Sequence, residues 1–516
     1  MLPSLPGPEL FFGLCSPIGT DNKKVTKIIA NCLKRYSYDI EYFKVTDLMK
    51  SIDVSGMSLN DTNLEDRYDT YIKYANKIRE LFRQPYVLAT LCSAAVRNFR
   101  RSKGATSYIK KQAYVFDQFK RPEEIALLRQ VYGRLFIMIS VYSDRERRIE
   151  TLTNRIAFGH SEARPDEEHR ATARSLADRD EREDGDSNGQ RLQDTFATAD
   201  LFINMDDPDA AEKLVERFLE GLFGANFVSP TRQEYGMYLA RNTALRSLDL
   251  SRQVGATIMT KEGETITAGC NEVPKANGGT YWYKDASEAR DYKKGYDSNE
   301  QIKRSLLSSF TKQLVELGYL REEITKDDVS AIILKETSRG GGLRDTQLMD
   351  LLEFGRIIHA EMSALCDAAR LGRSVKDAIL FCTTFPCHIC AKHIIAAGIR
   401  KVVFIEPYPK SYAEQLHGDA IVVGGSEHSN KVVFEPFIGI APQRYRDIFE
   451  RGRRKDDAGK FKEWIDEPPE HQPIVKLTVA TYLDNEIAVT KLLSEASKSL
   501  IADGKISITP PAEERL

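Results

Sequence analysis

The sequence predicts an α/β protein of two parts, and two observations indicate this class. In the first half, short apolar runs alternate with helical stretches, which is typical of a parallel sheet with helices on both faces. In the second half, helices and buried strands alternate around one histidine and two closely spaced cysteines. We therefore expect two sheets in two domains.

The first half opens with a strand, a glycine-bearing loop and a helix. Lys24–Tyr36 has apolar residues at helical spacing and predicts that helix. The strand-like runs of this half are Phe11–Cys15, Glu41–Val45, Ala113–Asp117, Leu135–Tyr142 and Leu201–Met205.

In the second half, small apolar residues at helical spacing predict a helix over 360–369. Ala378–Thr383 has the composition of a buried strand, Cys387 opens a second helix that Gly398 ends, and Lys401–Ile405 predicts another strand. The two helices would point their positive N-terminal ends at one place, and that environment favours thiolates over thiols.

Length and composition limit the function classes. A chain of 516 residues is too long for one compact core, so two domains with insertions are expected. The net charge of −2 shows no basic excess that would indicate nucleic-acid binding. Eight scattered cysteines, with no secretory leader and no long apolar run, predict reduced thiols in a cytoplasmic protein without a membrane segment.

The most informative motif is His359-Ala360-Glu361, followed after 28 positions by Cys387-His388-Ile389-Cys390. His359, Cys387 and Cys390 are three ligands of the type that zinc prefers, and the fourth position stays open for water, whose pKa on zinc falls to about 7. Glu361 is not a ligand in this pattern, so it can carry the proton that an amine leaving group needs. Together with Pro386, the motif resembles the H-x-E…P-C-x-x-C signature of zinc-dependent nucleobase deaminases.

A structural zinc is the alternative interpretation of this motif. It would require a fourth ligand, for which Cys366 and His388 are the candidates. Cys366 lies two helical turns after His359, which suits a core cysteine, and a side chain inside the C-x-x-C turn normally points away from the metal. The open, catalytic site is therefore the favoured hypothesis.

Residues from about 236 to 450 resemble the deoxycytidylate deaminase branch of the cytidine deaminase superfamily, which implies an α/β/α domain. Ser251–Ile258 resembles the first strand of that family. Gly269–Pro274 resembles its G-x-N-G-x-P segment, and this implies that Asn271 binds the sugar hydroxyl. Glu272 stands where the family has glycine, so the pocket floor is expected to differ.

Two further substrate-binding residues follow from this resemblance. They are Ala360, inside the motif, and Tyr408, which falls where the family has an aromatic residue near the base or sugar. A turn role for Asn271 and a packing role for Tyr408 are the alternatives.

The first half resembles a P-loop nucleotide-kinase-like domain with a degenerate loop. Its phosphate-loop candidates are Gly13, Ser16, Gly19 and Thr20. The two glycines are one residue too far apart for G-x-x-x-x-G-K-[ST], and Thr20-Asp21 replaces the lysine and the hydroxyl residue of that motif. We therefore expect a nucleotide, with Mg²⁺, as the ligand of this loop and no phosphoryl transfer.

The expected domain limits are 1–235 for the kinase-like regulatory part, 236–455 for the deaminase-like part and 456–516 for a C-terminal extension of unknown role. Within the first domain, the charged segment 160–195 matches the position of a nucleotide-kinase lid. Within the second, an insertion at 283–344 interrupts the family pattern, and a flap over the substrate is one interpretation of it.

The whole arrangement, over about residues 8 to 450, resembles the bacterial anti-phage dCTP deaminases. That resemblance implies deamination of dCTP and dCMP to deoxyuridine nucleotides and depletion of dCTP during phage infection. It also implies a small inhibitory RNA from the same locus as a partner. The resemblance to deoxycytidylate deaminases implies a homo-oligomer such as a hexamer. The alternatives are a deaminase of RNA or single-stranded DNA, and a nucleotide-sensing scaffold with a structural zinc.

Overall fold

The structure, a computed structural model, describes residues 5–162, 164–181, 188–285, 288–320, 328–338, 340–344, 346–408, 411–424, 430–462, 464, 472–474 and 480–508. The chain divides into two compact units. Unit 1 comprises Met1–Glu234 with Ile438–Leu516, and unit 2 comprises Tyr235–Phe437. Both contain a mixed α/β arrangement, which confirms the predicted class.

Unit 1 is built on a six-stranded sheet in the order β13-β6-β5-β1-β4-β2. The strands are β1 (Leu10–Cys15), β2 (Asp39–Lys44), β4 (Gln112–Asp117), β5 (Phe136–Tyr142), β6 (Leu201–Asn204) and β13 (Gly439–Ile440). All pairings are parallel except that of β13 with β6. Each strand predicted in the first half is present, and the first strand lies in the middle of the sheet.

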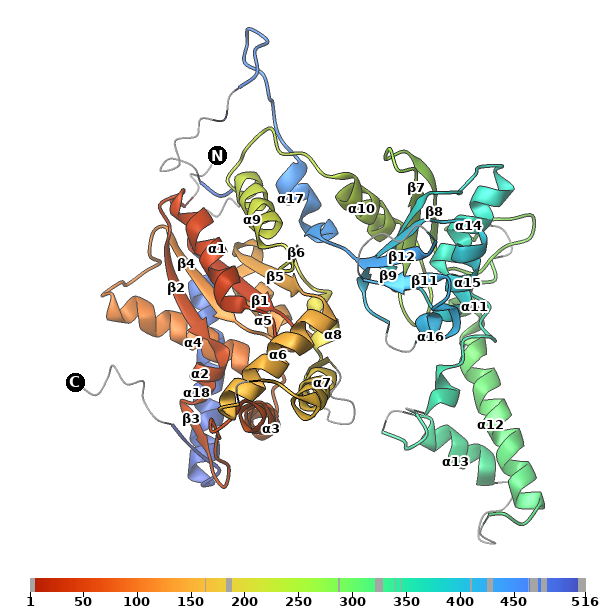
Figure 1. The fold of residues 1–516 in the computed structure, drawn as a ribbon, viewed down its shortest axis with the longest axis horizontal. Helices are drawn as coiled ribbons and strands as arrows, with labels where there is room; N and C mark the ends of the chain where they lie inside the picture. Colours follow the sequence, from red (N-terminus) through yellow and green to blue (C-terminus); the bar gives the residue numbers. More distant parts are fainter. Residues whose placement is uncertain are drawn as a thin grey trace. The chain divides into compact units, whose positions relative to one another are not determined.

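Helices cover both faces of this sheet (Figure 1). Helix α1 contacts α9, and α4 contacts α5 and α18. The helices of unit 1 are α1 (Asn22–Lys34), α2 (Val45–Met49), α3 (Leu64–Phe82), α4 (Val87–Ser102), α5 (Pro122–Tyr132), α6 (Arg145–Gly159), α7 (Glu167–Glu181), α8 (Leu192–Phe196), α9 (Pro208–Leu222), α17 (Tyr445–Phe449) and α18 (Tyr482–Ala502). Short 3₁₀ turns lie at η1 (Gly133–Leu135) and η3 (Pro442–Arg444).

The expected limits at 455 and 456 were wrong, because the chain from Ile438 onward belongs to unit 1. β13 extends the sheet by pairing with β6, and α18 packs on α4 and α5. β14 (Ile506–Ile508) also pairs with β3 (Ile52–Val54) in a separate two-stranded sheet. These contacts are between residues far apart in sequence, so no local sequence pattern predicts them.

The charged segment 160–195 contains α7 and α8, while residues 163 and 182–187 lie outside the described residues. Small and apolar side chains of α7, including Ala173 and Ala177, pack against Ile18 and against Ile149 and Leu152 of α6. One face of α7 is thus part of a core cluster beside the loop that follows β1.

Unit 2 contains a second six-stranded sheet, in the order β11-β12-β10-β9-β7-β8. Its strands are β7 (Gly255–Met259), β8 (Thr265–Cys270), β9 (Ile379–Thr384), β10 (Lys401–Glu406), β11 (Ile421–Val423) and β12 (Val432–Pro436). β7 is antiparallel to both neighbours, and the other pairings are parallel. The helices are α10 (Arg232–Ala244, in this unit from Tyr235), α11 (Asp291–Lys294), α12 (Ser298–Glu316), α13 (Asp328–Glu336), α14 (Ala360–Arg370), α15 (His388–Ala396) and α16 (Ala413–His417), with a 3₁₀ turn at η2 (Gln347–Asp350).

Helix α14 packs closely on β7 and β8 because Gly269 leaves room for it. A Cβ atom at Gly269 would lie 2.5 Å from the backbone nitrogen of Ala364 and 2.6 Å from the carbonyl oxygen of Ala360. Any side chain here would push away α14, the helix that His359 directly precedes and whose first turn carries Glu361.

The insertion expected at 283–344 contains α11, α12 and α13. A small core cluster joins Leu307 of α12, Val329 and Ile333 of α13, and Met349 of the η2 turn (Gln347–Asp350) that follows the insertion. In the described part of the chain, no helix is both long enough and apolar enough to cross a membrane.

A buried charge network ties the C-terminal helix α18 into unit 1. Arg100 contacts Glu9 at 2.8 Å and Glu486 at 2.5 Å, and the side chains of all three are at most 5% exposed. Tyr114 and Tyr482 also donate hydrogen bonds to Glu9. Burial raises the pKa of Glu486 and the positive charge of Arg100 opposes that shift.

We expect Arg100→Met to lower the free energy of unfolding of unit 1 by about 3–5 kcal/mol, because it leaves two buried carboxylates uncompensated. Chemical denaturation followed by circular dichroism measures this. The control is Lys77→Met, which removes an exposed pair with Glu80 and should cost less than about 1 kcal/mol. Equal effects of the two variants would show that the network does not stabilise unit 1.

Candidate active site

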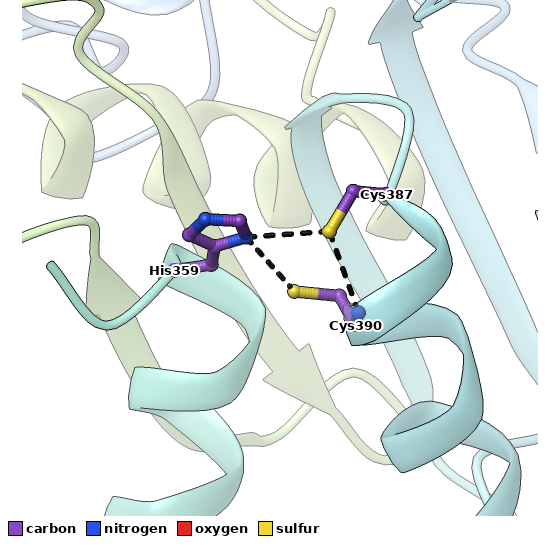
Figure 2. A group of neighbouring side chains, drawn as sticks. All are labelled: His359, Cys387 and Cys390. Carbon is purple, nitrogen blue, oxygen red and sulfur yellow. Dashed lines mark hydrogen bonds between the residues drawn. The ribbon is translucent and has the colours of Figure 1, made fainter. Parts of the chain in front are cut away.

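The three predicted ligand side chains meet at the N-terminal ends of two helices. His359 directly precedes α14, and Cys387 occupies the same position before α15. Nδ1 of His359 lies 3.3 Å from Sγ of Cys387 and 3.4 Å from Sγ of Cys390, so the imidazole faces both sulfur atoms (Figure 2). The structure thus brings together residues 28 and 31 positions apart.

The spacing and the donor set fit a zinc ion. With Zn–N near 2.0–2.1 Å and Zn–S near 2.3 Å, two ligand atoms of a tetrahedral site are about 3.6 Å apart. The observed separations of 3.3 and 3.4 Å are close to that value. Among the described residues, His359, Cys387 and Cys390 are the group at this place whose ligand atoms all lie within 4.8 Å of one another.

Neither candidate for a fourth ligand belongs to this group. Cys366 is exposed on α14. The ring of His388 faces Tyr412 at 5.8 Å, and its Nε2 lies 3.9 Å from Glu353. In the described part of the chain, three ligands therefore converge, and the arrangement fits a site with an open position better than a closed structural site.

The electrostatics of the ligand set favour an anionic sulfur. Hydrogen bonds from Cys390, and then from His359, lower the pKa of Cys387 to about 4. The hydrogen bond with Cys387 raises the pKa of His359 to about 9. Without metal, the shifts favour a thiolate at Cys387 that pairs with an imidazolium at His359.

Glu361 lies in the first turn of α14 and is 4% exposed. Burial raises the pKa of this carboxyl group, and the positive charge of His359 acts in the opposite direction. A buried acid with a raised pKa beside three metal-type ligands is suited to accept a proton and to return it.

A cavity of about 210 Å³ lies next to these residues. The predicted residues His359, Ala360, Glu361 and Cys387 line it, and so do Asn271 and Tyr408. Tyr408 also packs against the core of unit 2, so the structure supports both interpretations of this residue.

Asn271 is engaged with the chain itself. Its amide nitrogen donates hydrogen bonds to the Asp249 carboxylate at 2.9 Å and to the Arg252 carbonyl at 2.6 Å, while its oxygen accepts from the Val254 amide at 2.7 Å. Asn271 therefore holds the loop 249–254 at the rim of the cavity.

Glu272, the departure from the family pattern, is fully buried beneath this rim. Its carboxylate accepts hydrogen bonds from the Leu248 amide at 3.0 Å and the Val273 amide at 2.9 Å, and it lies 3.5 Å from Arg290. Its backbone pairs with Ile358, the residue before His359. Glu272 is not among the residues that line the cavity; its carboxylate contacts Arg290 of the insertion, and its backbone pairs with the residue before His359.

The sequence did not identify several residues that line the cavity. Asp291 of the insertion pairs with Arg356 at 2.5 Å, and Asp297 and Asn299 contribute from the start of α12. Arg252 lines the rim and pairs with Glu406. Among these residues, only Arg356 could have been suspected from the sequence, because it lies three residues before His359.

The predicted phosphate-loop residues lie elsewhere, in unit 1. Gly13 is inside β1, where a Cβ atom would lie 2.8 Å from the ring of Phe136, so packing requires this glycine and Gly13 is not part of the loop. Ser16, Gly19 and Thr20 do lie in the loop between β1 and α1. Gly19 has φ of +89°, a conformation that glycine adopts without strain.

Comparisons with known proteins agree with the motif. Residues 230–406 match the family described as the cytidine and deoxycytidylate deaminase zinc-binding region. The deoxycytidylate deaminase of Enterobacteria phage T2 is 46% identical over 54 residues, which cover 10% of this chain and 29% of that protein. ComE operon protein 2 of Bacillus subtilis (strain 168) is 39% identical over 66 residues, which cover 13% of this chain and 35% of that protein.

The match thus spans about a third of the length of these relatives. A solved dCMP deaminase from the cyanophage S-TIM5, in complex with dCMP and dUMP, is 18% identical. The alignment covers 40% of this chain and 98% of that one, with a TM-score of 0.23, too low to support a conclusion about the fold. The family match and the short, more similar segments show that residues 230–406 are similar to the zinc-binding region of cytidine and deoxycytidylate deaminases.

Proposed function

We propose that this protein is a zinc-dependent deaminase that hydrolyses deoxycytidine nucleotides, dCTP and dCMP, to deoxyuridine nucleotides and ammonia. The observation that carries the proposal is the position of His359 Nδ1 against both cysteine sulfurs, with buried Glu361 at the same cavity. The reaction consumes one water molecule and replaces the amino group at C4 of cytosine with oxygen.

In this proposal His359, Cys387 and Cys390 hold the zinc. When bound, zinc acts as a Lewis acid that makes water a nucleophile at neutral pH. Glu361 takes the proton that water releases and delivers it to the departing amine, so one carboxyl group serves as base and then as acid. Its burial keeps the proton-bearing form accessible, because the charged form is poorly solvated.

The cavity favours a free nucleotide over a polynucleotide. Its volume suits a small molecule, and the only arginine or lysine side chains among its lining residues are those of Arg252 and Arg356. A strand of RNA or DNA needs a longer positively charged track with exposed aromatic side chains. We assign Ala360 and Tyr408 to contacts with the base and sugar, and Asn271 to the shape of the sugar-binding rim.

The resemblance to anti-phage dCTP deaminases supports a biological proposal. Depletion of dCTP would limit phage DNA synthesis in the cytoplasm of an infected cell. The same resemblance supports a small RNA from the same locus as the inhibitor, and the resemblance to deoxycytidylate deaminases supports a homo-oligomer such as a hexamer.

The substrate is tested by incubating the zinc-loaded chain separately with dCTP, dCMP, CTP and cytidine, and separating the products by chromatography. We expect deoxyuridine nucleotides from the deoxynucleotides and little product from cytidine, which lacks phosphate. A single-stranded oligonucleotide is added in a further arm at low and high salt. Deamination of the oligonucleotide alone would contradict the proposal.

Glu361→Gln should keep zinc and lose roughly 10²–10⁴-fold in turnover, because the amide cannot carry the proton. Initial rates on dCTP and zinc content are measured on the same preparation. The matched control is Glu414→Gln, an exposed acid on α16, which should leave both unchanged. Turnover of Glu361→Gln at the wild-type rate would remove Glu361 from the mechanism.

His359→Ala and Cys387→Ala should each lose zinc, since two protein ligands hold the ion poorly. Cys366→Ala should keep full occupancy, because this thiol is exposed and outside the ligand group. Elemental analysis of the purified variants is the measurement. Zinc loss in Cys366→Ala together with full zinc in Cys387→Ala would assign the ligands differently.

A further inference from the structure

Four acidic side chains line the cavity of unit 2, and they differ in what they bind within the chain. They are Asp249, Asp291, Asp297 and Glu361. Glu361 lies beside the zinc-type ligands and is assigned to proton transfer. The partners of the other three decide which carboxylate is left for a substrate.

Two of these three acids are engaged with the chain itself. Asp249 accepts hydrogen bonds from the Ser251 amide at 2.7 Å and from the Asn271 side chain at 2.9 Å, one on each carboxylate oxygen. Asp291 forms an ion pair with Arg356 at 2.5 Å. Both oxygens of Asp249 are therefore used, and an arginine balances the charge of Asp291.

Asp297 has an oxygen atom to spare. It directly precedes α12, and its Oδ1 accepts hydrogen bonds from the amides of Asn299 at 2.8 Å and Glu300 at 3.4 Å. Its Oδ2 has no hydrogen bond or ion pair with any residue that the structure describes. An anionic oxygen at a cavity is a strong acceptor for an N–H or O–H group of a ligand.

The place of Asp297 at the cavity is fixed by Asn299. The amide nitrogen of Asn299 donates a hydrogen bond to the Leu351 carbonyl at 2.8 Å, and its oxygen accepts one from the Phe354 amide at 3.2 Å. The chain from this segment to His359 forms one wall of the cavity. The start of α12 is therefore attached to the same stretch of chain that carries a zinc-type ligand.

Asp297 also lies close to the rim that Asn271 shapes. Burial raises the pKa of the Asp249 carboxyl group, and the negative charge of Asp297 adds to that rise. The family resemblance assigns the sugar hydroxyl to Asn271, yet both N–H groups of that amide already donate to Asp249 and to the Arg252 carbonyl. Asn271 has no N–H group left for the sugar, whereas Asp297 has a free acceptor.

A deoxycytidine nucleotide has only two groups that can donate a hydrogen bond to this acceptor. One is the 4-amino group of the base, which the proposed reaction places at Glu361. The other is the 3′-hydroxyl group of the sugar. The phosphates are repelled by a carboxylate and therefore belong near Arg252 and Arg356, the two arginines of the cavity lining. The 3′-hydroxyl group is thus the part of this substrate class that matches Asp297.

We propose that Asp297 selects the sugar of the substrate by accepting a hydrogen bond from its free 3′-hydroxyl group. This role rests on the proposed deamination of deoxycytidine nucleotides, and it deepens it. A cytosine nucleotide inside a strand has an esterified 3′ oxygen, which has no proton to donate and brings a phosphate charge towards the carboxylate. Asp297 therefore discriminates against polynucleotides as well as against sugars without the hydroxyl.

The test compares dCTP with its 2′,3′-dideoxy analogue, which lacks only the 3′-hydroxyl group, on the full-length, zinc-loaded chain. The wild-type kcat/KM should be about 10–100-fold lower for the analogue, the effect of one hydrogen bond to a charged group. The loss should lie in KM, because the hydroxyl is remote from the reacting carbon. In Asp297→Ser this ratio should fall below about threefold, since serine caps α12 equally well but its short side chain leaves no acceptor for the sugar.

The ratio separates recognition from a structural role, because damage to the cavity lowers kcat/KM for both substrates alike. Glu300→Gln is the matched control: this acid lies in the first turn of the same helix, is not among the lining residues, and should leave the ratio unchanged. If Asp297→Ser does not fold with full zinc, Asp297→Asn replaces it. Asparagine also caps the helix, and the ratio should fall at least about threefold, because a neutral hydrogen bond is weaker than a charged one.

Two results would overturn this role of Asp297 and leave the proposed function standing. One is an unchanged ratio in the variant that turns over dCTP. The other is equal kcat/KM of the wild-type chain for dCTP and the dideoxy analogue. If the wild-type chain deaminates dCMP alone, dCMP and its dideoxy analogue are compared in the same way. No deamination of either nucleotide by the wild-type chain would refute the proposed function itself, and the role of Asp297 with it.

Discussion

The chemistry of this protein depends on the convergence of two helix N-termini at one point. His359 and Cys387 each precede a helix, and Nδ1 of the first lies 3.3 Å from Sγ of the second. The positive ends of α14 and α15 favour the anionic sulfur, and the first turn of α14 sets Glu361 beside it. This geometry requires α14 to lie tightly on β8, which Gly269 permits.

The second feature of the site is that an insertion forms part of its wall. Glu272 pairs with Arg290, and Asp291 pairs with Arg356. Arg290 and Asp291 are adjacent in the insertion. Asp291 contacts the segment that leads into His359, at Arg356, and Arg290 contacts Glu272, whose backbone pairs with Ile358 of that segment. A buried carboxylate in place of the family's glycine makes sense in this setting, because it fixes the insertion against the pocket and accepts two backbone amides.

Unit 1 shows the same use of charge for a different purpose. Its loop after β1 has neither the spacing nor the lysine of a phosphate loop, yet an ammonium group and an amide converge on one anion there. That anion is Asp180, a residue of the charged segment 160–195, which the sequence matched to the position of a nucleotide-kinase lid. Part of the segment is solvated, but the inner face of α7 is buried, and its acidic end serves as a counter-ion.

The sequence alone determined the fold class, the parallel strands β1, β2, β4, β5 and β6 of the first sheet, the strands β9 and β10 of the second, and the zinc-type ligand set. These depend on periodicity and on a motif confined to two short segments. The sequence could identify the site residues because His359 and Glu361 lie within one helical turn of each other, and so do Cys387 and Cys390. Only the tertiary structure decided that Ile438–Leu516 joins unit 1, that Asp291 and Asp297 line the cavity, and that Lys120 donates a hydrogen bond to the loop after β1. Those observations concern residues far apart in sequence, which no local pattern connects. Charged side chains such as these are common in sequences, and the role of each depends on which opposite charge lies next to it in the folded chain.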